Sequence, residues 1–592
     1  MEDEKIEVKE YSGKIKPEFI QKALKMYQKY KSDKAELHER VISNNKWYKS
    51  KYAHIINPKT NETEPATSFI FSAIENKYAD AIDNFPMPNL LEREPSDSET
   101  AKILSKIIPV QLDMSGYKKV YKDNWRRKLK HGTAIYGVFY NENKEDIDIR
   151  ALDILSVFCD MHVKDVQESQ FLFIVTAVDN DILKEQYPAF RTLFTGSASV
   201  ETYSGIHQID DRTEVIDCYY KKADGTLHMI KFVGSNVIDA TEDIEGYENG
   251  LYSHGMYPVI FDVLYPEEDC PFGFGIVDTI RNPQMYIDKL DGIIIKNAIV
   301  SGKTRWIIRD TGGINEKEFT DLSRDVIHSA GDVGESSIRA VQSNGLSNYV
   351  LEHRKEKINE LKEVIGNRDF QQGGTTSGVT AASAISTLQQ AGEKLSRAII
   401  DDSYDTYKAL VIMCIELIRE FYSEERVYRI TNEIGQTEFA SFSNAQLVNK
   451  QYITDALGFP IEEKYRRVEF DIDVVPQRQN PFSREANNQT ILSLWTNGFF
   501  MPDNFDVSIM ALQAMNFDGK EKIIENMQNM QKQIAEQQMQ AQQMQQQAAA
   551  QIAPIQSESN GNDELVPIGQ AGGDTAAAED ELVPIGKVGG NG

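Results

Sequence analysis

A chain of 592 residues, 41% of them hydrophobic, can bury sizeable cores, which excludes a wholly disordered protein. Its formal net charge of -27 argues against tight sequence-specific DNA binding, because such binding needs a basic surface that displaces counterions. The same charge suits a protein that DNA slides past, since like-charge repulsion keeps the polymer mobile.

The four cysteines lie far apart in the sequence and form no C-x-x-C pair. They are Cys159, Cys218, Cys270 and Cys414. This spacing predicts free thiols in a reducing compartment. The acidic start of the chain lacks the apolar stretch of a signal peptide, and no apolar run approaches the ~20 residues of a membrane span. We therefore expect a protein of cytoplasm-like conditions that has no membrane partner.

Helices are predicted over much of the first 114 residues. The first 60 residues form a helix-rich lead-in, and residues 67–85 carry an apolar or aromatic residue every four positions, which is one face of a helix. The breaker Pro86-Met87-Pro88 is expected to close that helix, and another helix is expected at about 100–114.

The next helix, over 116–131, has two stripes at a spacing of four residues. The apolar stripe consists of Tyr117, Tyr121, Trp125 and Leu129. The basic stripe consists of Lys118, Lys122, Arg126 and Lys130. The basic stripe is either a solvated face or a contact with an acidic surface of another subunit. Gly132 is expected to end the helix, and short β-like runs follow from 133 to 263.

Long helical patterns dominate the second half of the chain. The pattern at 276–302 is separated from a charged helix at 346–367 by a mixed polar segment with a short β-run at 305–309. A Gly/Thr/Ser/Gln loop then precedes a very long helix at about 380–424, and strands and turns follow over 426–475.

The C-terminal part returns to helix over 484–550 and then becomes a tail. Its helical end carries a Met/Gln heptad seam. In the tail the sequence D-E-L-V-P-I-G occurs at 563–569 and again at 580–586. This repeat is either a pair of short docking motifs or a duplication within a linker.

Each catalytic template fails at a specific residue. Gly302-Lys303-Thr304 ends like a phosphate loop, but Asn297 occupies the position of the first glycine, and the segment closes a helix instead of opening one. The glycines at 373–378 are followed by Val379-Thr380, which supply no lysine for phosphates. No histidine pair has metal-ligand spacing, and G-x-S-x-G is absent. The chain is therefore not recognisable as an enzyme, and no cofactor or metal is predicted.

Several motifs, taken in order, resemble those of the portal proteins of tailed bacteriophages. Pro271-Phe272-Gly273-Phe274-Gly275 precedes the first long helix, and Ser377-Gly378-Val379-Thr380-Ala381-Ala382 follows the Gly-rich loop. Residues 128–134 look like the family's K-x-G-T/S junction between a helix and a strand. Residues 153–160 look like its P-x-x-V-F-x-D-P strand, and residues 494–498 look like its L-x-x-x-G turn. The resemblance covers about residues 65–530.

This resemblance implies an α+β portal fold with a wing, a two-helix stem, a small α/β clip, a long spine helix and a helical crown. The expected boundaries are: wing 1–270, first stem helix 271–302, clip 303–345, second stem helix 346–368, tunnel loop 369–379, spine helix 380–425, wing strands 426–480, crown 481–550, and disordered acidic tail 551–592.

The resemblance also assigns roles to residues. The tunnel loop would face DNA through Gln371, Gln372, Gly373, Gly374, Thr375, Thr376, Ser377 and Gly378. The second stem helix would contact other subunits through Glu352, Arg354, Lys355, Glu356, Lys357, Glu360 and Lys362. The clip would face the packaging motor or adaptor through Arg305, Trp306, Arg309, Asp310, Glu316, Glu318 and Asp321. The crown would pack through Met527, Met530, Ile534 and Met544.

The function implied is that of a homo-oligomeric ring of about twelve subunits at one capsid vertex, through which DNA is packaged and ejected. The expected partners are the large terminase subunit, the head–tail adaptor, the major capsid protein, scaffold, and double-stranded DNA passing without sequence specificity. The protein is expected in the virion, and in the host cytoplasm during assembly. Two alternatives remain: a structural or scaffold adaptor that docks partners through its acidic repeat tail, and a nucleotide- or metal-dependent enzyme of another type.

Overall fold

The computed structural model describes residues 13–52, 61, 66–203, 205–302, 305–309, 313–321, 323, 325–331, 338–341, 346–366, 394–431, 437–454 and 460–478, with short helical pieces at 491–493, 509, 523–524, 526–527 and 529–530. The chain divides into two compact units, Met1–Glu521 and Lys522–Gly592. In the second unit the described residues, which include Met527 and Met530, are helical.

Mixed helix and sheet confirm the α+β class. The helices are α1 (Pro17–Asp33), α2 (Ala35–Tyr48), α3 (Phe69–Asp83), α4 (Ser98–Met114), α5 (Tyr117–His131), α6 (Asn180–Gln186), α7 (Ile276–Gly302), α8 (Glu316–Thr320), α9 (Asn348–Ile365) and α11 (Lys394–Phe421). Short 3-10 turns are η2 (Pro95–Asp97), η3 (Val166–Glu168), η4 (Pro188–Leu193), η5 (Thr241–Asp243) and η8 (Asn444–Leu447).

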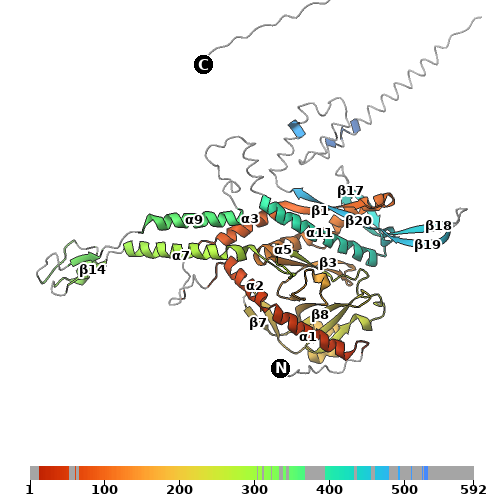
Figure 1. Ribbon diagram of the computed structural model, residues 1–592, viewed down its shortest axis with the longest axis horizontal. Coiled ribbons are helices and arrows are strands. Elements are labelled where there is room, and N and C mark those ends of the chain that lie inside the picture. The colour runs from red at the N-terminus through yellow and green to blue at the C-terminus, as the bar shows by residue number, and fades with distance from the viewer. Residues whose placement is uncertain are drawn as a thin grey trace, which may run out of the picture. The chain divides into compact units, whose positions relative to one another are not determined.

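A five-stranded antiparallel sheet forms one layer of the body. Its strand order is β10 (Asn236–Ala240), β9 (Leu227–Val233), β8 (Arg212–Lys221), β5 (Phe171–Asp179) and β4 (Val157–Phe158). Helix α1 lies against this sheet (Figure 1). Tyr27 and Tyr30 of α1 pack on Phe173, with ring centroids 5.3 and 6.0 Å apart. The apolar face of α1 is thus buried on a sheet whose strands are more than 100 residues away in sequence.

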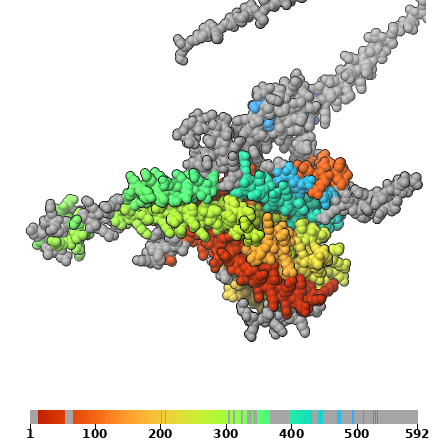
Figure 2. Space-filling model, in the orientation of Figure 1, coloured from red at the N-terminus to blue at the C-terminus, as the bar shows by residue number. Residues whose placement is uncertain are grey.

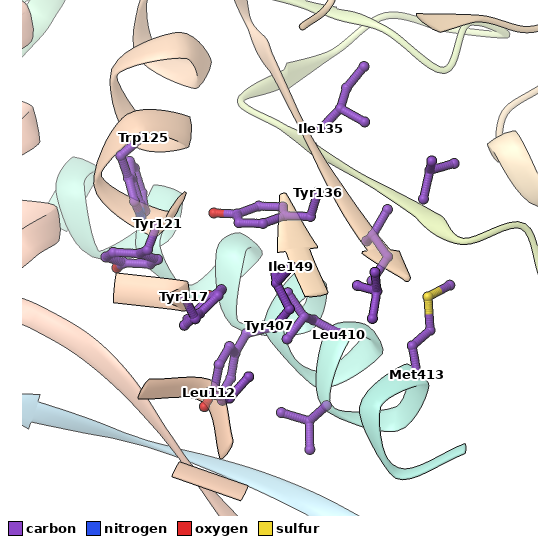
Figure 3. Packing of buried hydrophobic residues seen from close by; sticks show 14 of the residues in the cluster. Leu112, Tyr117, Tyr121, Trp125, Ile135, Tyr136, Ile149, Tyr407, Leu410 and Met413 are labelled. Carbon is purple, nitrogen blue, oxygen red and sulfur yellow. The ribbon is translucent and has the colours of Figure 1, made fainter. Parts of the chain in front are cut away.

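The second layer is a three-stranded sheet covered by helices. Its order is β11 (Val259–Val263), β2 (Thr133–Asn141) and β3 (Asp146–Leu152). Figure 3 shows the core that forms where α5, these strands and α11 meet. Tyr117, Tyr121 and Trp125 of the predicted apolar stripe are each at most 3% exposed there. That prediction is therefore confirmed.

The remaining strands form small two-stranded pairs. They are β1 (Asn84–Glu92) with β20 (Phe470–Arg478), β6 (Ala198–Thr202) with β7 (Gly205–Ile209), β12 (Tyr265–Pro266) with β13 (Gly273–Phe274), β14 (Arg305–Ile308) with β15 (Ile338–Val341), β16 (Arg426–Thr431) with β17 (Thr437–Phe442), and β18 (Val448–Thr454) with β19 (Pro460–Arg467).

Two local expectations need correction. The Pro86-Met87-Pro88 run does follow the end of α3 at Asp83, but it lies inside strand β1, where Pro86 is opposite Pro476. Proline fits there because a two-stranded pair leaves edge positions that need no N–H donor. The strand expected over 153–160 is limited to Val157–Phe158. Before it, the side chain of Asp153 accepts from the Leu155 N–H at 3.1 Å and turns the backbone instead.

Candidate functional site

Two helices form an arm, which we define as α7, the segment 303–347 and α9. The antiparallel helices α7 and α9 lie side by side along the arm (Figures 1 and 2). Arg354 of α9 donates from Nη2 to Asp291 Oδ2 of α7 at 3.1 Å, and its Nε also contacts that carboxylate. This two-pronged contact fixes the register of the helices, because a guanidinium and a carboxylate match in both spacing and plane.

The ends of α9 are set by its capping residues. The Ser347 side chain accepts from the Tyr349 N–H, which satisfies one of the orphan donors of the first turn. Gly366 adopts a left-handed φ of 74° after the last turn, a conformation that favours glycine. The helix therefore occupies Asn348–Ile365, two residues shorter at each end than the 346–367 expected from the sequence.

Only the root of α7 is buried in the body. Its buried residues end at Asp288, which accepts from the Tyr52 hydroxyl at 2.8 Å. Beyond that point no described residue of α7 is buried, and α9 buries only Leu361 and Ile365. The outer parts of α7 and α9 therefore bury little apolar surface within one chain.

The far end of the arm, which we call the tip, carries the β14–β15 hairpin. The two strands pair antiparallel from Arg305 opposite Val341 to Ile308 opposite Ile338. The Trp306 ring meets Phe319 of α8 edge-on, with centroids 5.3 Å apart. Three other apolar side chains of the tip are also exposed: Ile307 at 60%, Val326 at 64% and Ile327 at 46%.

The predicted partner-facing residues of the tip divide into two groups. Glu318 accepts from the His328 N–H at 2.9 Å, and Asp321 accepts from the Ser323 N–H at 3.1 Å, so both brace the tip itself. Trp306, Arg309 and Glu316 are exposed. Arg305 is described only in its backbone, and Asp310 lies outside the described residues. The resemblance singled out Trp306 and six charged residues of the tip, and it did not include Val326 and Ile327.

The charged residues predicted for subunit contacts on α9 also divide. Arg354 is engaged with Asp291 in the same chain, and Lys357 donates to Glu360 at 2.6 Å, one turn away. Glu352, Lys355 and Glu356 are exposed, whereas Lys362 is half-buried. Sequence reasoning missed the exposed apolar residues of the arm. They are Tyr286, Ile293, Ile295, Ile299 and Val300 on α7, and Tyr349, Leu351 and Val364 on α9.

Glycines of the Pro-Phe-Gly-Phe-Gly motif pack the arm's root against the end of α5. A Cβ at Gly275 would lie 2.6 Å from the Lys130 carbonyl oxygen, and a Cβ at Gly132 would overlap the Phe274 backbone. Gly132 also has a φ of +87°, which L side chains rarely adopt. The junction at 128–134 and the motif at 271–275, which both resemble portal sequences, therefore meet in one close backbone contact.

A buried ionic group lies behind this junction. Lys128 of α5 donates to Asp262 Oδ1 of β11 at 2.6 Å and also contacts Ser403 of α11. Thr406 donates to the same oxygen at 3.3 Å. The Lys128 and Asp262 side chains are 0% and 4% exposed. The group ties α5, β11 and α11 together, because a buried charge is tolerated only when it is paired and hydrogen-bonded.

A second buried lysine lies under the same motif. Lys34, between α1 and α2, donates to the carbonyls of Ile154 and Val157 and lies over the rings of Phe158 and Phe272, 4.9 and 4.8 Å from their centroids. Burial lowers the pKa of Lys34 to about 8. Carbonyls and aromatic faces stabilise the ammonium without a carboxylate partner. This lysine therefore has a packing role that requires no ligand.

The predicted basic stripe is not simply a solvated face. Arg126 lies over the Tyr78 ring at 3.9 Å, and Lys130 lies over Tyr48 at 5.1 Å. The pKa of Lys130 is lowered to about 8, mainly by burial and secondly by the positive charge of the nearby Arg127. Lys118 stays exposed. Half of the stripe thus packs on α2 and α3, where the long side chains cover aromatic rings.

Several functional predictions concern residues that the structure does not describe. The tunnel loop 369–379 lies wholly outside the described residues, as do Ile534 and Met544 of the crown, the first part of the spine helix before Lys394, and the tail 551–592. Those predictions therefore rest on the sequence alone.

The described residues were compared with the requirements of a metal site and of a membrane span. Among them, no group of three or more His, Cys, Asp or Glu is placed to hold a metal ion. In the same residues, no helix combines the length and apolar character needed to cross a membrane. All four cysteines are free thiols, three of them buried, and Cys270 is half-buried. Lys303 follows the last residue of α7, so the Gly302-Lys303 pair closes a helix as the sequence predicted.

Comparison with known families identifies the class of protein. A family model described as phage P22-like portal protein matches residues 78–259 and 226–562, which is most of the chain. The class is therefore that of the phage portal proteins, structural components of the virion capsid. Within that class the chain belongs to the P22-like portal protein family. The resemblance drawn from the sequence is confirmed. No curated protein matches the chain.

Proposed function

We propose that this portal protein assembles into a closed ring of about twelve copies at one capsid vertex, and that double-stranded DNA enters and leaves through the hole in the ring. The observation that carries the proposal is the arm. Helix α7 of the arm exposes Tyr286, Ile293 and Ile299 at 57%, 51% and 56%. A soluble protein gains by covering such residues, and further copies of the same chain provide the cover.

The tip is the docking site for the packaging motor and afterwards for the neck adaptor. Its support is the exposure of four apolar side chains of the tip, Trp306, Ile307, Val326 and Ile327, together with the charged Arg309 and Glu316. Interfaces that partners can leave combine apolar and charged residues in this way. The tip accordingly binds the large terminase subunit during packaging and a head–tail adaptor later, while the wing contacts the capsid protein.

DNA passes without sequence specificity. The net charge of -27 keeps phosphates from adhering to the protein as a whole. The Gly, Thr, Ser and Gln residues at 371–378 form a tunnel loop that makes brief hydrogen bonds with the passing duplex, and their lack of lysine and arginine avoids a strong grip. Catalysis during packaging is the role of the motor and not of this chain.

Electron microscopy of the purified full chain tests the ring directly. Negative-stain images are expected to show rings with a central hole, also for a chain that lacks 551–592. Images of separate single molecules at every concentration would contradict the proposal. Loss of rings on removal of 551–592 would instead favour an adaptor that works through its acidic repeat.

The tip assignment has its own test. Replacing Ile307 and Val326 with serine is expected to abolish binding of the large terminase subunit while rings still form. Ile182, exposed at 49% on α6, provides the matched control Ile182→Ser, which should bind the motor like the wild type. Motor binding unchanged in the tip variant, or rings lost in it, would exclude the assigned role.

A further inference from the structure

The β6–β7 hairpin, residues 198–209, is held at its base by one residue. Asn180 donates from its side chain to the Gly196 carbonyl at 3.1 Å and from its N–H to the Asp211 carbonyl at 2.9 Å. Asn180 itself is 6% exposed, so this clamp is part of the body. Among the side chains that the structure describes in 198–209, only Ala198 is buried. A segment with so few buried apolar contacts can open while the rest of the fold stays intact.

The tip of the hairpin is held by two side chains. Glu201 contacts Nδ1 of His38 on α2. The Tyr203 hydroxyl donates to Asp153 Oδ1 at 2.8 Å. The Tyr203 ring is also stacked on the ring of His131 at the end of α5, with centroids 5.2 Å apart and an angle of 18° between the planes. The hairpin thus forms a strap across α2 and α5, and we call residues 198–209 the strap.

The histidine under the strap is buried without hydrogen bonds to the described residues. His131 is 0% exposed, and neither its Nδ1 nor its Nε2 has a hydrogen-bond partner there. A neutral imidazole has one donor and one acceptor, whereas the imidazolium has two donors and a charge. Burying the charged form without a partner costs far more than burying the neutral form. The closed strap therefore accommodates only a neutral His131.

The charges around His131 act in the same direction. Lys130 and Arg127 on its own helix and Arg40 on α2 all disfavour a further positive charge. The carboxylates on the elements packed around the ring are engaged elsewhere. Asp153 accepts from Tyr203, Glu201 contacts His38, Glu267 pairs with Arg40 at 2.6 Å, and Asp278 accepts from Asn44 at 2.9 Å. A proton on His131 would therefore lie among cations.

The other histidine that contacts the strap stays neutral in the closed form. The pKa of His38 is lowered to about 4, mainly by burial and secondly by Lys34, although Glu201 acts in the opposite direction. The contact between His38 and Glu201 therefore persists in the closed strap between pH 7.5 and 5.5. Any exposure of His38 on opening would add to the effect of His131 and not oppose it.

We propose that the β6–β7 hairpin is a pH-sensitive strap, which is closed over His131 at neutral pH and opens at its tip in mild acid while its base stays on Asn180. In the open form the His131 ring meets water and takes up a proton with ordinary affinity. The closed form is therefore favoured above the ordinary histidine pKa of ~6.5, and it loses stability relative to the open form as the pH falls below that value.

The position of His131 connects the strap to the root of the arm. The next residue is Gly132, where a Cβ would lie 2.3 Å from the Phe274 backbone. An open strap therefore brings water next to the contact between α5 and the arm. Opening of the strap involves a single chain and does not depend on the proposed ring.

Hydrogen exchange of the full chain at pH 7.5 and 5.5 tests the strap. The exchange rates of peptides from 198–209 are divided by the rates of the unprotected peptides at each pH, which leaves the opening constant. A histidine that regains a pKa of ~6.5 on opening raises this constant about tenfold between the two pH values. Peptides from β8 are expected to stay better protected than the strap at both. Equal protection of the strap and β8, or a strap that does not respond to pH, would overturn the proposal.

Two variants distinguish the role of His131 from a general loosening of the hairpin. His131→Phe keeps a ring against Tyr203 but has no titrating group, so the response of the strap to pH should be lost or much reduced. Tyr203→Ala removes the cover, so the strap should exchange faster at pH 7.5 and respond little to pH, because water reaches His131 in both forms. Tyr203→Ala also keeps the test decisive if His131→Phe fails to fold.

Ser199→Ala, at an exposed position on the same hairpin, is the matched control and should respond to pH like the wild type. A response of wild-type size in His131→Phe or in Tyr203→Ala would overturn the proposal. Loss of the response in Ser199→Ala would also overturn it, because any change in the hairpin would then have the same effect.

Discussion

The body and the arm of this portal protein are stabilised in opposite ways. In the body, α5 and α11 bury aromatic rings against β2, and even charges such as Lys128 and Asp262 are paired in the interior. In the arm, Ile293 and Ile299 remain more than half exposed. The body can therefore fold within one chain, whereas in the proposed ring other copies cover the arm. On that proposal, the buried residues of the body maintain the fold and the exposed apolar residues of the arm serve assembly.

The largest expected effect comes from placing a charge on the arm. Ile293→Asp should abolish ring formation, because a carboxylate in a contact between copies is left without a partner. The unfolding free energy of the monomer should change by less than about 0.5 kcal/mol, as for other surface substitutions. Ring formation is measured by native mass and stability by denaturant unfolding. Ile182→Asp, on α6, is the matched control and should keep the rings.

The next largest effect is expected in the body. Asp262→Ala leaves Lys128 buried without its carboxylate and should lower the unfolding free energy by about 3–5 kcal/mol. The double variant Lys128→Met/Asp262→Leu removes both charges and should recover most of that loss. If Asp262→Ala unfolds like the wild type in denaturant, the pair does not stabilise the body.

A pH dependence should distinguish the two regions further. The pKa of His131 lies well below its ordinary value of 6.5, mainly because the ring is buried and secondly because Lys130 is nearby. The unfolded chain therefore takes up a proton below pH 6.5 that the folded body does not, and stability falls as the pH decreases, by up to about 1.4 kcal/mol per unit for this residue.

Replacing His131 with phenylalanine removes that proton uptake. The slope of unfolding free energy between pH 6.5 and 5 should therefore be shallower than in the wild type. Equal slopes in the wild type and His131→Phe would contradict the burial argument.

The smallest expected effect is local to the arm. Arg354→Ala removes the two-pronged contact with Asp291 and should weaken the packing of α9 on α7 by about 1–2 kcal/mol. Hydrogen exchange of the monomer should then be faster in 348–365 and unchanged in β2. Lys355→Ala, at an exposed neighbouring position, should leave exchange as it is.

The sequence predicted the helices of the arm because their apolar spacing is local. The pattern at 276–302 coincides with α7, and the stripe from Tyr117 to Leu129 is buried as expected. The pairing of strands that lie far apart in the sequence has no such local pattern. Strand β1 pairs with β20 nearly 400 residues later, and nothing in Pro86-Met87-Pro88 indicates that partner.

The candidate site was predicted in outline and not in detail. The motif at 271–275 indicated the root of the arm, but the Cβ clashes that require Gly132 and Gly275 depend on the folded backbone. The charges of α9 stood out in the sequence, yet Arg354 is engaged within its own chain. Ile293 and Ile299 look like core residues in a sequence, because spacing alone does not show which apolar positions a neighbouring helix covers.

The most direct test of the arm as an assembly surface is native mass spectrometry of the wild-type full chain beside Ile293→Asp. We expect a single closed species of about twelve copies for the wild type and a folded monomer for the variant. A wild type that stays monomeric, or an Ile293→Asp variant that forms the same large species, would contradict the role assigned to the arm.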